Sequence, residues 1–126
     1  MRSVLTIPIA IIVISTAVSL AHAQRATEQF TPLGKSPGIS GVSSYIGEIA
    51  DVDAANRTIS IAGDQESWSV EITEKTNIWL DRSKYKATNV VGAFDDLQAG
   101  RQVEVKPEDD QPQRAEWIKI VPETGQ

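Results

Sequence analysis

The side chains that most often carry out chemistry are scarce in this chain, which contains one histidine, His22, and no cysteine. Cysteine supplies thiolate nucleophiles, histidine supplies the common general base, and the two together make up most zinc and copper sites. Their scarcity argues against these chemistries and leaves no disulfide to hold the fold together. We therefore expect a protein with no cofactor and no bound metal.

A basic stretch, Arg82-Ser83-Lys84-Tyr85-Lys86, places three cations around one aromatic ring. Loops of this kind bind single-stranded nucleic acid by charge and stacking. The whole chain is acidic, however, with a formal net charge of -5, which argues against a nucleic-acid partner. Two interpretations remain for this stretch: a solvated loop, or a contact to an anionic polymer of the cell envelope.

The three tryptophans differ in how clearly the sequence fixes their direction. Trp68 is in phase with Val70 and Ile72, which predicts that it packs in the core. Trp79 and Trp117 lie beside residues of which one must face outward, so their direction stays open. If both reach the surface, they could form a platform for a sugar ring or a peptide.

Acidic residues cluster at 108–110 and at 95–96, where they could be taken for calcium ligands. A calcium-binding loop places its oxygen ligands at alternate positions around a glycine, and neither cluster has this spacing. We interpret both as solvated turns. Glycan hydrolysis by carboxylates needs two paired carboxyl groups, and no spacing in the chain singles out such a pair.

The elements that position these residues follow an apolar N-terminal segment. Arg2 precedes an apolar run over Val4–Leu20, and Ala21-His22-Ala23 comes next. This order predicts a signal peptide, residues 1–23, cleaved after Ala23, and an exported protein that is periplasmic or extracellular. The alternative is an uncleaved membrane anchor, because the apolar run is long for a leader. Cleavage would also remove the only histidine.

Residues 24–43 are rich in Thr, Ser, Gly and Pro and show neither a helix nor a strand period. This composition predicts a flexible N-terminal tail. The alternative is a strand-like arm that lies on the domain through Phe30, Leu33 and Ile39.

Residues 44–122 show the alternation of apolar and polar residues that is typical of β-strands. We expect a bulge near Gly47, a polar loop at 81–92, and one short helical turn between Phe94 and Leu97. The strands are predicted at 45–52, 58–62, 67–73, 76–80, 102–106 and 115–121. Because exposed sheet edges must be protected, we expect a small all-β, OB-like barrel of five or six strands, with a C-terminal tail at 123–126. A small open sandwich is the alternative.

The order of these signals resembles a family of small secreted bacterial β-barrel domains of unknown function, OB-like in architecture, over roughly Ser44–Val121. The matching residues are Gly47, Ile49 and Asp53; Arg57 to Ile61; Thr76 and Ile78; Asp96, Leu97 and Gly100 before Val103 to Val105; and Ala115 and Ile118. They are turn glycines and barrel residues, and none belongs to a catalytic motif. The resemblance implies a fold and a binding or envelope module, and it carries no site.

We therefore expect a non-catalytic exported module of the periplasm or cell surface that binds a protein or an envelope polymer. The candidate surface consists of Trp79, Trp117, Arg82, Lys84, Tyr85 and Lys86. The alternative is a carboxylate-based hydrolase that acts on envelope glycans. The scarcity of catalytic residue types favours the first, so we expect that the protein is not an enzyme.

Overall fold

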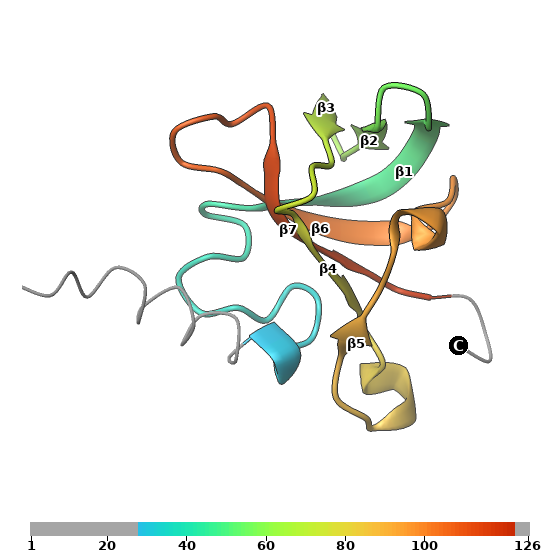
Figure 1. Ribbon diagram of the computed structural model, residues 1–126. Coiled ribbons are helices and arrows are strands. Elements are labelled where there is room, and N and C mark those ends of the chain that lie inside the picture. Colours follow the sequence, from blue (N-terminus) through green and yellow to red (C-terminus); the bar gives the residue numbers. More distant parts are fainter. Residues whose placement is uncertain (1–27, 123–126) are drawn as a thin grey trace, which may run out of the picture.

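Seven β-strands and two short 3-10 turns are the main elements of residues 28–122, the part of the chain that the computed structural model describes (Figure 1). The strands are β1 (Tyr45–Asp53), β2 (Thr58–Ala62), β3 (Ser67–Glu71), β4 (Asn77–Leu80), β5 (Val90–Val91), β6 (Gln102–Pro107) and β7 (Ala115–Ile120). The turns are η1 (Ser83–Tyr85) and η2 (Phe94–Asp96). The predicted signal peptide and C-terminal tail lie outside the described residues. No helix among residues 28–122 is long and apolar enough to cross a membrane.

The strands form one mixed sheet in the order β3-β2-β1-β6-β7-β4-β5, in which only the β4–β7 pair is parallel. The predicted alternation is confirmed in β3, where Val70 is buried and its neighbour Ser69 is exposed. Val70 lies opposite Ile59 of β2, so that two branched side chains pack directly across the strands. Burial of each such side chain contributes roughly 1.5–3 kcal/mol.

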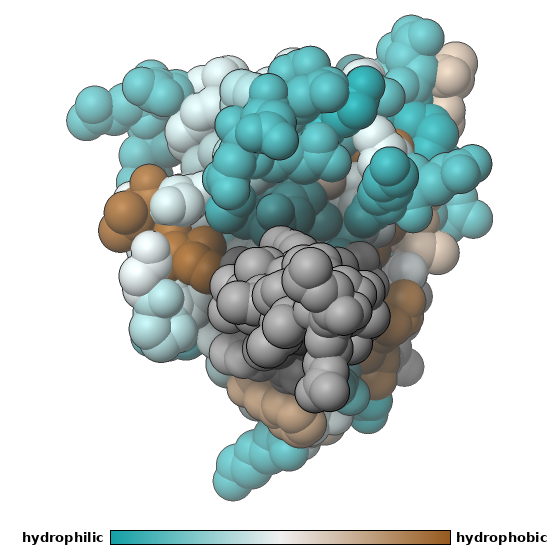
Figure 2. Space-filling view, turned by 60° about the vertical axis from the view of Figure 1, so that its left-hand side comes forward, coloured by the Kyte–Doolittle hydropathy of each residue, from teal (hydrophilic) through white to brown (hydrophobic). Residues whose placement is uncertain are grey.

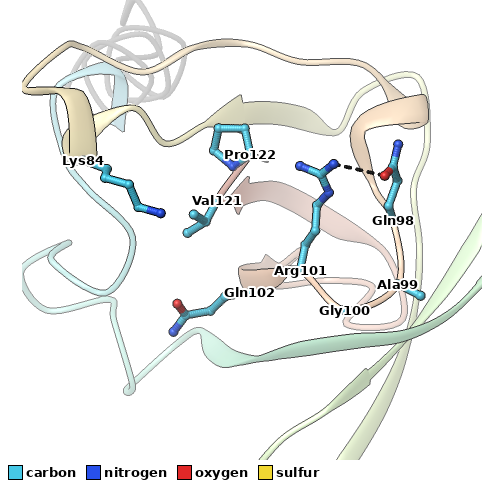
Figure 3. A pocket seen from close by; sticks show the side chains of 8 residues that line it. All are labelled: Lys84, Gln98, Ala99, Gly100, Arg101, Gln102, Val121 and Pro122. Atoms are coloured by element: carbon cyan, nitrogen blue, oxygen red, sulfur yellow. Dashed lines mark hydrogen bonds between the residues drawn. The ribbon is translucent and has the colours of Figure 1, made fainter. Parts of the chain in front are cut away.

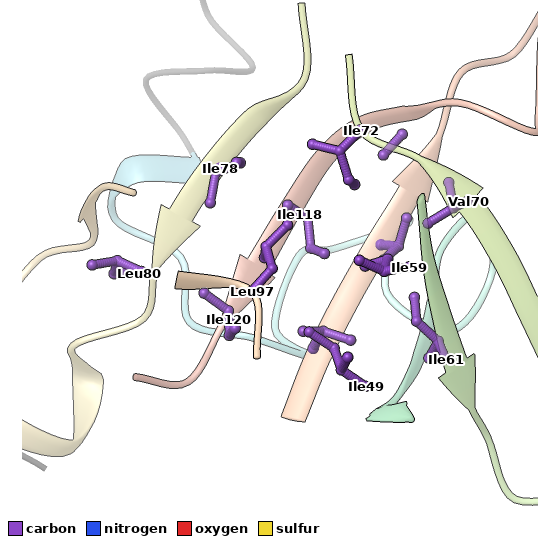
Figure 4. Packing of buried hydrophobic residues seen from close by; sticks show 13 residues of the cluster. Ile49, Ile59, Ile61, Val70, Ile72, Ile78, Leu80, Leu97, Ile118 and Ile120 are labelled. Atoms are coloured by element: carbon purple, nitrogen blue, oxygen red, sulfur yellow. The ribbon is translucent and has the colours of Figure 1, made fainter. Parts of the chain in front are cut away.

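The inner face of the curved sheet carries the hydrophobic core (Figure 4). Isoleucine and valine dominate it, as expected for strands whose branched side chains pack on a pleated surface. Leu97, which follows η2, adds a side chain from outside the sheet. With no cysteine in the chain, this core and the hydrogen bonds hold the fold.

The sheet is not closed, so the expected OB-like barrel of five or six strands is not confirmed. β3 and β5 stand at the two ends of the strand order, and β5 lies within the segment that was predicted as a loop. The physical reason lies at residues 72–76, where the Thr76 hydroxyl oxygen accepts a hydrogen bond from the Thr73 amide at 2.9 Å. The turn ends β3 and directs the chain to β7. The other expectation, a small open sandwich, does not describe this single sheet either.

The irregularity in β1 lies three positions beyond the predicted one. The pairing with β2 shifts between Ile49 and Asp51, so Ala50 is the extra residue. Gly47 has a different reason to be glycine: a Cβ atom there would come within 2.5 Å of the Ala62 carbonyl oxygen. Close approach of the two strands therefore excludes a side chain at this position.

Residues 28–44 lie against the outer face of β6 and β7, in place of the expected free tail, and we call this segment the arm. It begins with two helical residues, Glu28 and Gln29, continues in turns and contains no strand, and Phe30 is 66% exposed. The alternative prediction, a strand-like arm that packs on the domain through Phe30, is therefore not confirmed either. Hydrogen bonds from the arm to charged side chains of the sheet hold it in place.

Candidate functional site

The basic loop, which we define as residues 81–89, connects β4 to β5 and projects beside the arm (Figure 1). Its one carboxylate, Asp81, is 6% exposed and accepts hydrogen bonds from the Ser83 and Leu33 amides, each at 2.8 Å. Asp81 thus begins the η1 turn and connects the loop to the arm. Because this carboxylate is turned inward, it presents little negative charge on the outer surface of the loop.

The three cations that the sequence singled out lie on the outside of this loop. Lys84 and Lys86 are exposed, and Arg82 is half-buried. Among residues 28–122, the ion pairs involve Lys106 and Lys119, and none involves the loop cations. This is unexpected in a chain in which acidic residues outnumber basic ones. The loop therefore carries positive charge that the described protein does not neutralise.

A pocket of about 370 Å³ opens between the basic loop and the chain that enters β6 (Figure 3). Lys84 lies at one side of it, and Arg101, whose guanidinium is turned toward Gln98, lies at the other. Arg101 donates a hydrogen bond from Nη2 to the side-chain oxygen of Gln98 at 3.0 Å. The remaining lining residues are Ala99, Gly100, Gln102, Val121 and Pro122. Its described lining thus contains two cations and no carboxylate.

The two tryptophans of the candidate surface do not form an exposed platform. Their positions in β4 and β7 place both on the outer face of the sheet, away from the core. Trp117 is 3% exposed, with the Lys119 ammonium 4.7 Å from the centre of its ring. Trp79 is half-buried. The structure therefore does not bring Trp79 and Trp117 together with the basic loop as one open surface.

Trp68 packs against the edge of the core, as its phase predicts. Its ring stacks on Tyr45, with ring centres 4.4 Å apart and planes inclined by 19°. Burial raises the pKa of Tyr45 to about 12. These aromatic rings close one end of the core.

The clasp, a buried polar network between the arm and the sheet, has no counterpart in the sequence analysis. Glu28 forms an ion pair with Lys119, and Ser36 donates its hydroxyl hydrogen to Glu28 at 2.8 Å while accepting from Lys119 at 2.9 Å. All three residues are almost fully buried. A serine beside a lysine can serve nucleophilic catalysis, but here the lysine is ion-paired and the hydroxyl is inaccessible. The arrangement is therefore structural.

Glu104 is the second acidic centre of the clasp and is fully buried. Its two carboxylate oxygens accept hydrogen bonds from the Gly34 amide at 2.8 Å and from the Ser40 and Ser44 hydroxyls at 2.6 Å each. In the register of the sheet it lies opposite Lys119. The arm thus supplies the donors that a buried carboxylate requires.

The acidic clusters contain partnered and exposed carboxylates. Asp96 accepts a hydrogen bond from the Ala93 amide at 2.8 Å, and Asp109 pairs with Lys106 at 3.0 Å. Burial raises the pKa of Glu116, whose carboxylate lies 3.8 Å from the Lys106 ammonium. No cluster of histidine, cysteine and acidic residues within 28–122 is suited to hold a metal ion.

A second groove, of about 830 Å³, lies over β1 and β2 and bears on the alternative of a hydrolase. Two carboxylate residues, Glu48 and Asp64, line it together with three glycines, and no tryptophan does. A glycosidase site would need the two carboxyl groups set across a sugar-binding cleft. The groove lacks the aromatic wall that would stack a sugar ring, so it provides no specific support for that chemistry.

Comparisons of this chain with protein-family models, with curated proteins and with solved structures found no match. The candidate site therefore rests on its own geometry.

Proposed function

We propose that this chain is a non-catalytic exported module that binds an anionic polymer of the cell envelope through its basic loop. The observation that carries the proposal is the charge of the loop: Arg82, Lys84 and Lys86 have no ion pair within the described chain. Opposite charges attract across a surface without close shape matching, which suits a repetitive polymer. Of the two expected partner classes, protein and polymer, this favours the polymer.

The surface beside the arm is consistent with a polar partner. On the described surface that Figure 2 shows, hydrophilic residues dominate and the apolar ones form separate patches. The large exposed apolar residues of the described chain are Phe30, Val42, Tyr85 and Val91. Tyr85, 45% exposed, lies within the basic loop, where its ring can cover the carbon face of a sugar. This arrangement supports contact through charge and one aromatic ring.

The finer fold assignment is also a proposal: the sheet is an OB-like barrel that is interrupted at residues 72–76. β3 pairs with β2 and β4 pairs with β7, so one bent strand made of β3 and β4 would complete a ring of pairings. The Glu71 amide, which donates to the Gln113 carbonyl at 2.8 Å, supports this closure. Slow hydrogen exchange of the Glu71 amide is expected, and exchange at the rate of a free edge would contradict closure.

A pull-down on beads that carry immobilised polymers tests the proposed function. The chain without residues 1–23 should bind polygalacturonate or a polyglycerol-phosphate polymer at low salt, and a neutral glucan poorly. Because exposed charges are screened by ions, binding should weaken as salt rises. Lys86→Gln should reduce binding, whereas Lys75→Gln, which removes an equal charge from an exposed turn, should not. Absence of binding to both polyanions, or equal loss in the two variants, would overturn the proposal.

A further inference from the structure

We infer that the free edge of β3 is a docking site for an extended basic segment of another protein, which adds a strand to the sheet there. The inference goes beyond the proposed function, because it concerns a different surface and a partner of the opposite charge. Among the described residues, β3 stands at one end of the strand order, so one of its two sides has no neighbouring strand (Figure 1). Unpaired backbone groups at such an edge are the groups to which a further strand binds.

The hydrogen bonds around β3 show which of its amides face the free side. The Ile72 amide donates to the Arg57 carbonyl, which precedes β2, at 2.8 Å. Because successive residues of a strand direct their backbone groups to alternate sides, the backbone groups of Ser67 and Ser69 face away from β2. Within residues 28–122, no loop and no side chain accepts a hydrogen bond from these two amides. The edge therefore offers donors and acceptors at two alternate positions.

This edge is also accessible, whereas the other edge of the sheet is protected by its length. β5 has two residues and β3 has five, and neither lysine nor proline, the residues that commonly protect an edge, occurs in β3. Ser67 and Ser69 are exposed. Beyond residue 70 the edge is already occupied, because the Glu71 amide donates to the Gln113 carbonyl at 2.8 Å. The site therefore has room for a short extended segment alongside residues 67–70.

The charge at the closed end of this edge determines which kind of segment fits. A groove of about 520 Å³ begins at Glu71, and its other lining residues are Thr73, Glu74, Lys75, Glu108, Asp110, Gln111 and Arg114. None of its carboxylates forms an ion pair within the described chain. A lysine or arginine of an added strand would be attracted to them, whereas a second copy of this acidic chain would bring like charges together. The groove therefore favours a basic partner.

The two faces of β3 define the pattern of the partner. Ser67 and Ser69 lie on the exposed face, and Trp68 and Val70 lie on the face that packs with the core. An added strand alternates its side chains in the same way, so it matches β3 when basic residues alternate with branched apolar ones. The capped hexapeptide Lys-Val-Lys-Val-Lys-Val has this pattern and serves as the probe.

Amide hydrogen exchange of the ¹⁵N-labelled chain tests the edge. Without peptide, the Ser67 and Ser69 amides should exchange rapidly, and those of Trp68 and Val70 slowly, because only the latter face β2. With the peptide at ten times its dissociation constant, exchange at Ser67 and Ser69 should slow about tenfold. The peptide Glu-Val-Glu-Val-Glu-Val, which has the same pattern and the opposite charge, should not protect them.

Variants of the chain separate the backbone contact from the charge. Ser69→Pro removes a free donor that β2 does not use, so it should weaken peptide binding about tenfold, whereas Ser69→Ala retains the amide and should not. If Ser69→Pro does not fold, Ser69→Lys replaces it, because a lysine on the edge should repel the probe. Glu71→Gln should weaken binding about threefold, and Asp95→Asn, an equal change of charge at an exposed position of η2, should not.

Several results would overturn the inference: no protection by the basic peptide, equal protection by the acidic one, or equal affinity of the edge variant and Ser69→Ala. Slow exchange of Ser67 and Ser69 without peptide would also overturn it, and acceleration on dilution would then assign the edge to a second copy of the chain. Lys86→Gln should leave peptide binding unchanged, and Ser69→Pro should leave polymer binding unchanged. Failure at the edge is therefore distinguishable from failure of the proposed function.

Discussion

Lys119 in β7 and Lys84 in η1 carry the same ammonium group in opposite surroundings. Lys119 is fully buried, paired with Glu28 and bonded to Ser36, whereas Lys84 is exposed and has no ion pair among the described residues. A buried charge is stable only where partners replace the lost water, whereas an exposed charge needs no partner to be stable. The clasp therefore uses its charges for structure, and the basic loop keeps its charges available to a ligand.

The composition of the arm explains why it can satisfy buried charges. Serine hydroxyls and free backbone amides are small donors that reach a carboxylate without bringing further charge into the interface. Ser40 and Ser44 provide such donors to Glu104. Ser36 donates to Glu28, which is ion-paired with Lys119. A polar segment that would not fold alone thus becomes ordered on a sheet that offers charged acceptors.

The largest effect is expected where the clasp is broken. Lys119→Ala leaves the Glu28 carboxylate buried with its main partner removed, which should lower the free energy of unfolding by about 3–5 kcal/mol. Urea denaturation followed by tryptophan fluorescence measures this change. Lys75→Ala, in an exposed turn, is the matched control and should change it by no more than about 0.5 kcal/mol.

A paired replacement separates the charge from the packing. Glu28→Leu together with Lys119→Met removes both charges and retains apolar volume, so most of the loss should be recovered. A cost for Lys119→Ala equal to that of its control would mean that the arm does not hold this ion pair in solution.

The next largest effect concerns the attachment of the arm to the basic loop. The Asn89 side-chain amide donates to the Glu28 carbonyl at 2.8 Å and to the Thr31 carbonyl at 2.9 Å, and the residue is buried. Asn89→Ala should therefore cost about 1–3 kcal/mol, because it leaves buried acceptors without their donor. Hydrogen exchange should accelerate first in residues 28–40. Uniform acceleration over the whole sheet would show that the arm does not open separately.

The aromatic rings at the end of the core give a smaller, pH-dependent effect. Burial raises the pKa of Tyr45 to about 12 from 10.0, so the folded state favours the protonated phenol. The stabilisation is complete below pH 10 and is lost as the pH rises from 10 toward 12. Because the ring is partly exposed, we expect about 1–2 kcal/mol. Urea titrations at pH 9 and 11 should show a smaller difference in Tyr45→Phe than in the unaltered chain.

The strands were predictable because their signal is local. Val103 and Val105 alternate with polar residues, and the structure forms β6 there. The same alternation places Glu104 on the outer face and so predicts that it faces solvent. In the structure Glu104 is buried, because the arm covers it. Burial of an alternate polar residue depends on a partner far away in sequence, which periodicity cannot detect. The open sheet has the same kind of cause, since the turn at Thr73 and Thr76 decides where pairing with β2 ends.

The candidate site was predictable in part for the same reason. Three cations close together in sequence identified the loop that carries Lys84, and the structure leaves that loop at the surface. Arg101 was missed because it is an isolated cation after a turn glycine, and only the fold brings it opposite Lys84. Trp117 was undecided from its neighbours, and the structure buries it on the outer face of the sheet beside Lys119.

The smallest expected effect on stability is at Lys84, the exposed lysine that was compared above with the buried Lys119. Lys84→Gln removes a charge that makes no ion pair within the described chain, so the free energy of unfolding should change by less than about 0.5 kcal/mol. The change should stay this small at low and at high salt, because Lys84 makes no close ion pair within the described chain for salt to screen. Urea titrations at two salt concentrations measure this, with Lys75→Gln as the control. A clear destabilisation would mean that Lys84 has a structural partner like Lys119, and the contrast between the clasp and the loop would fail.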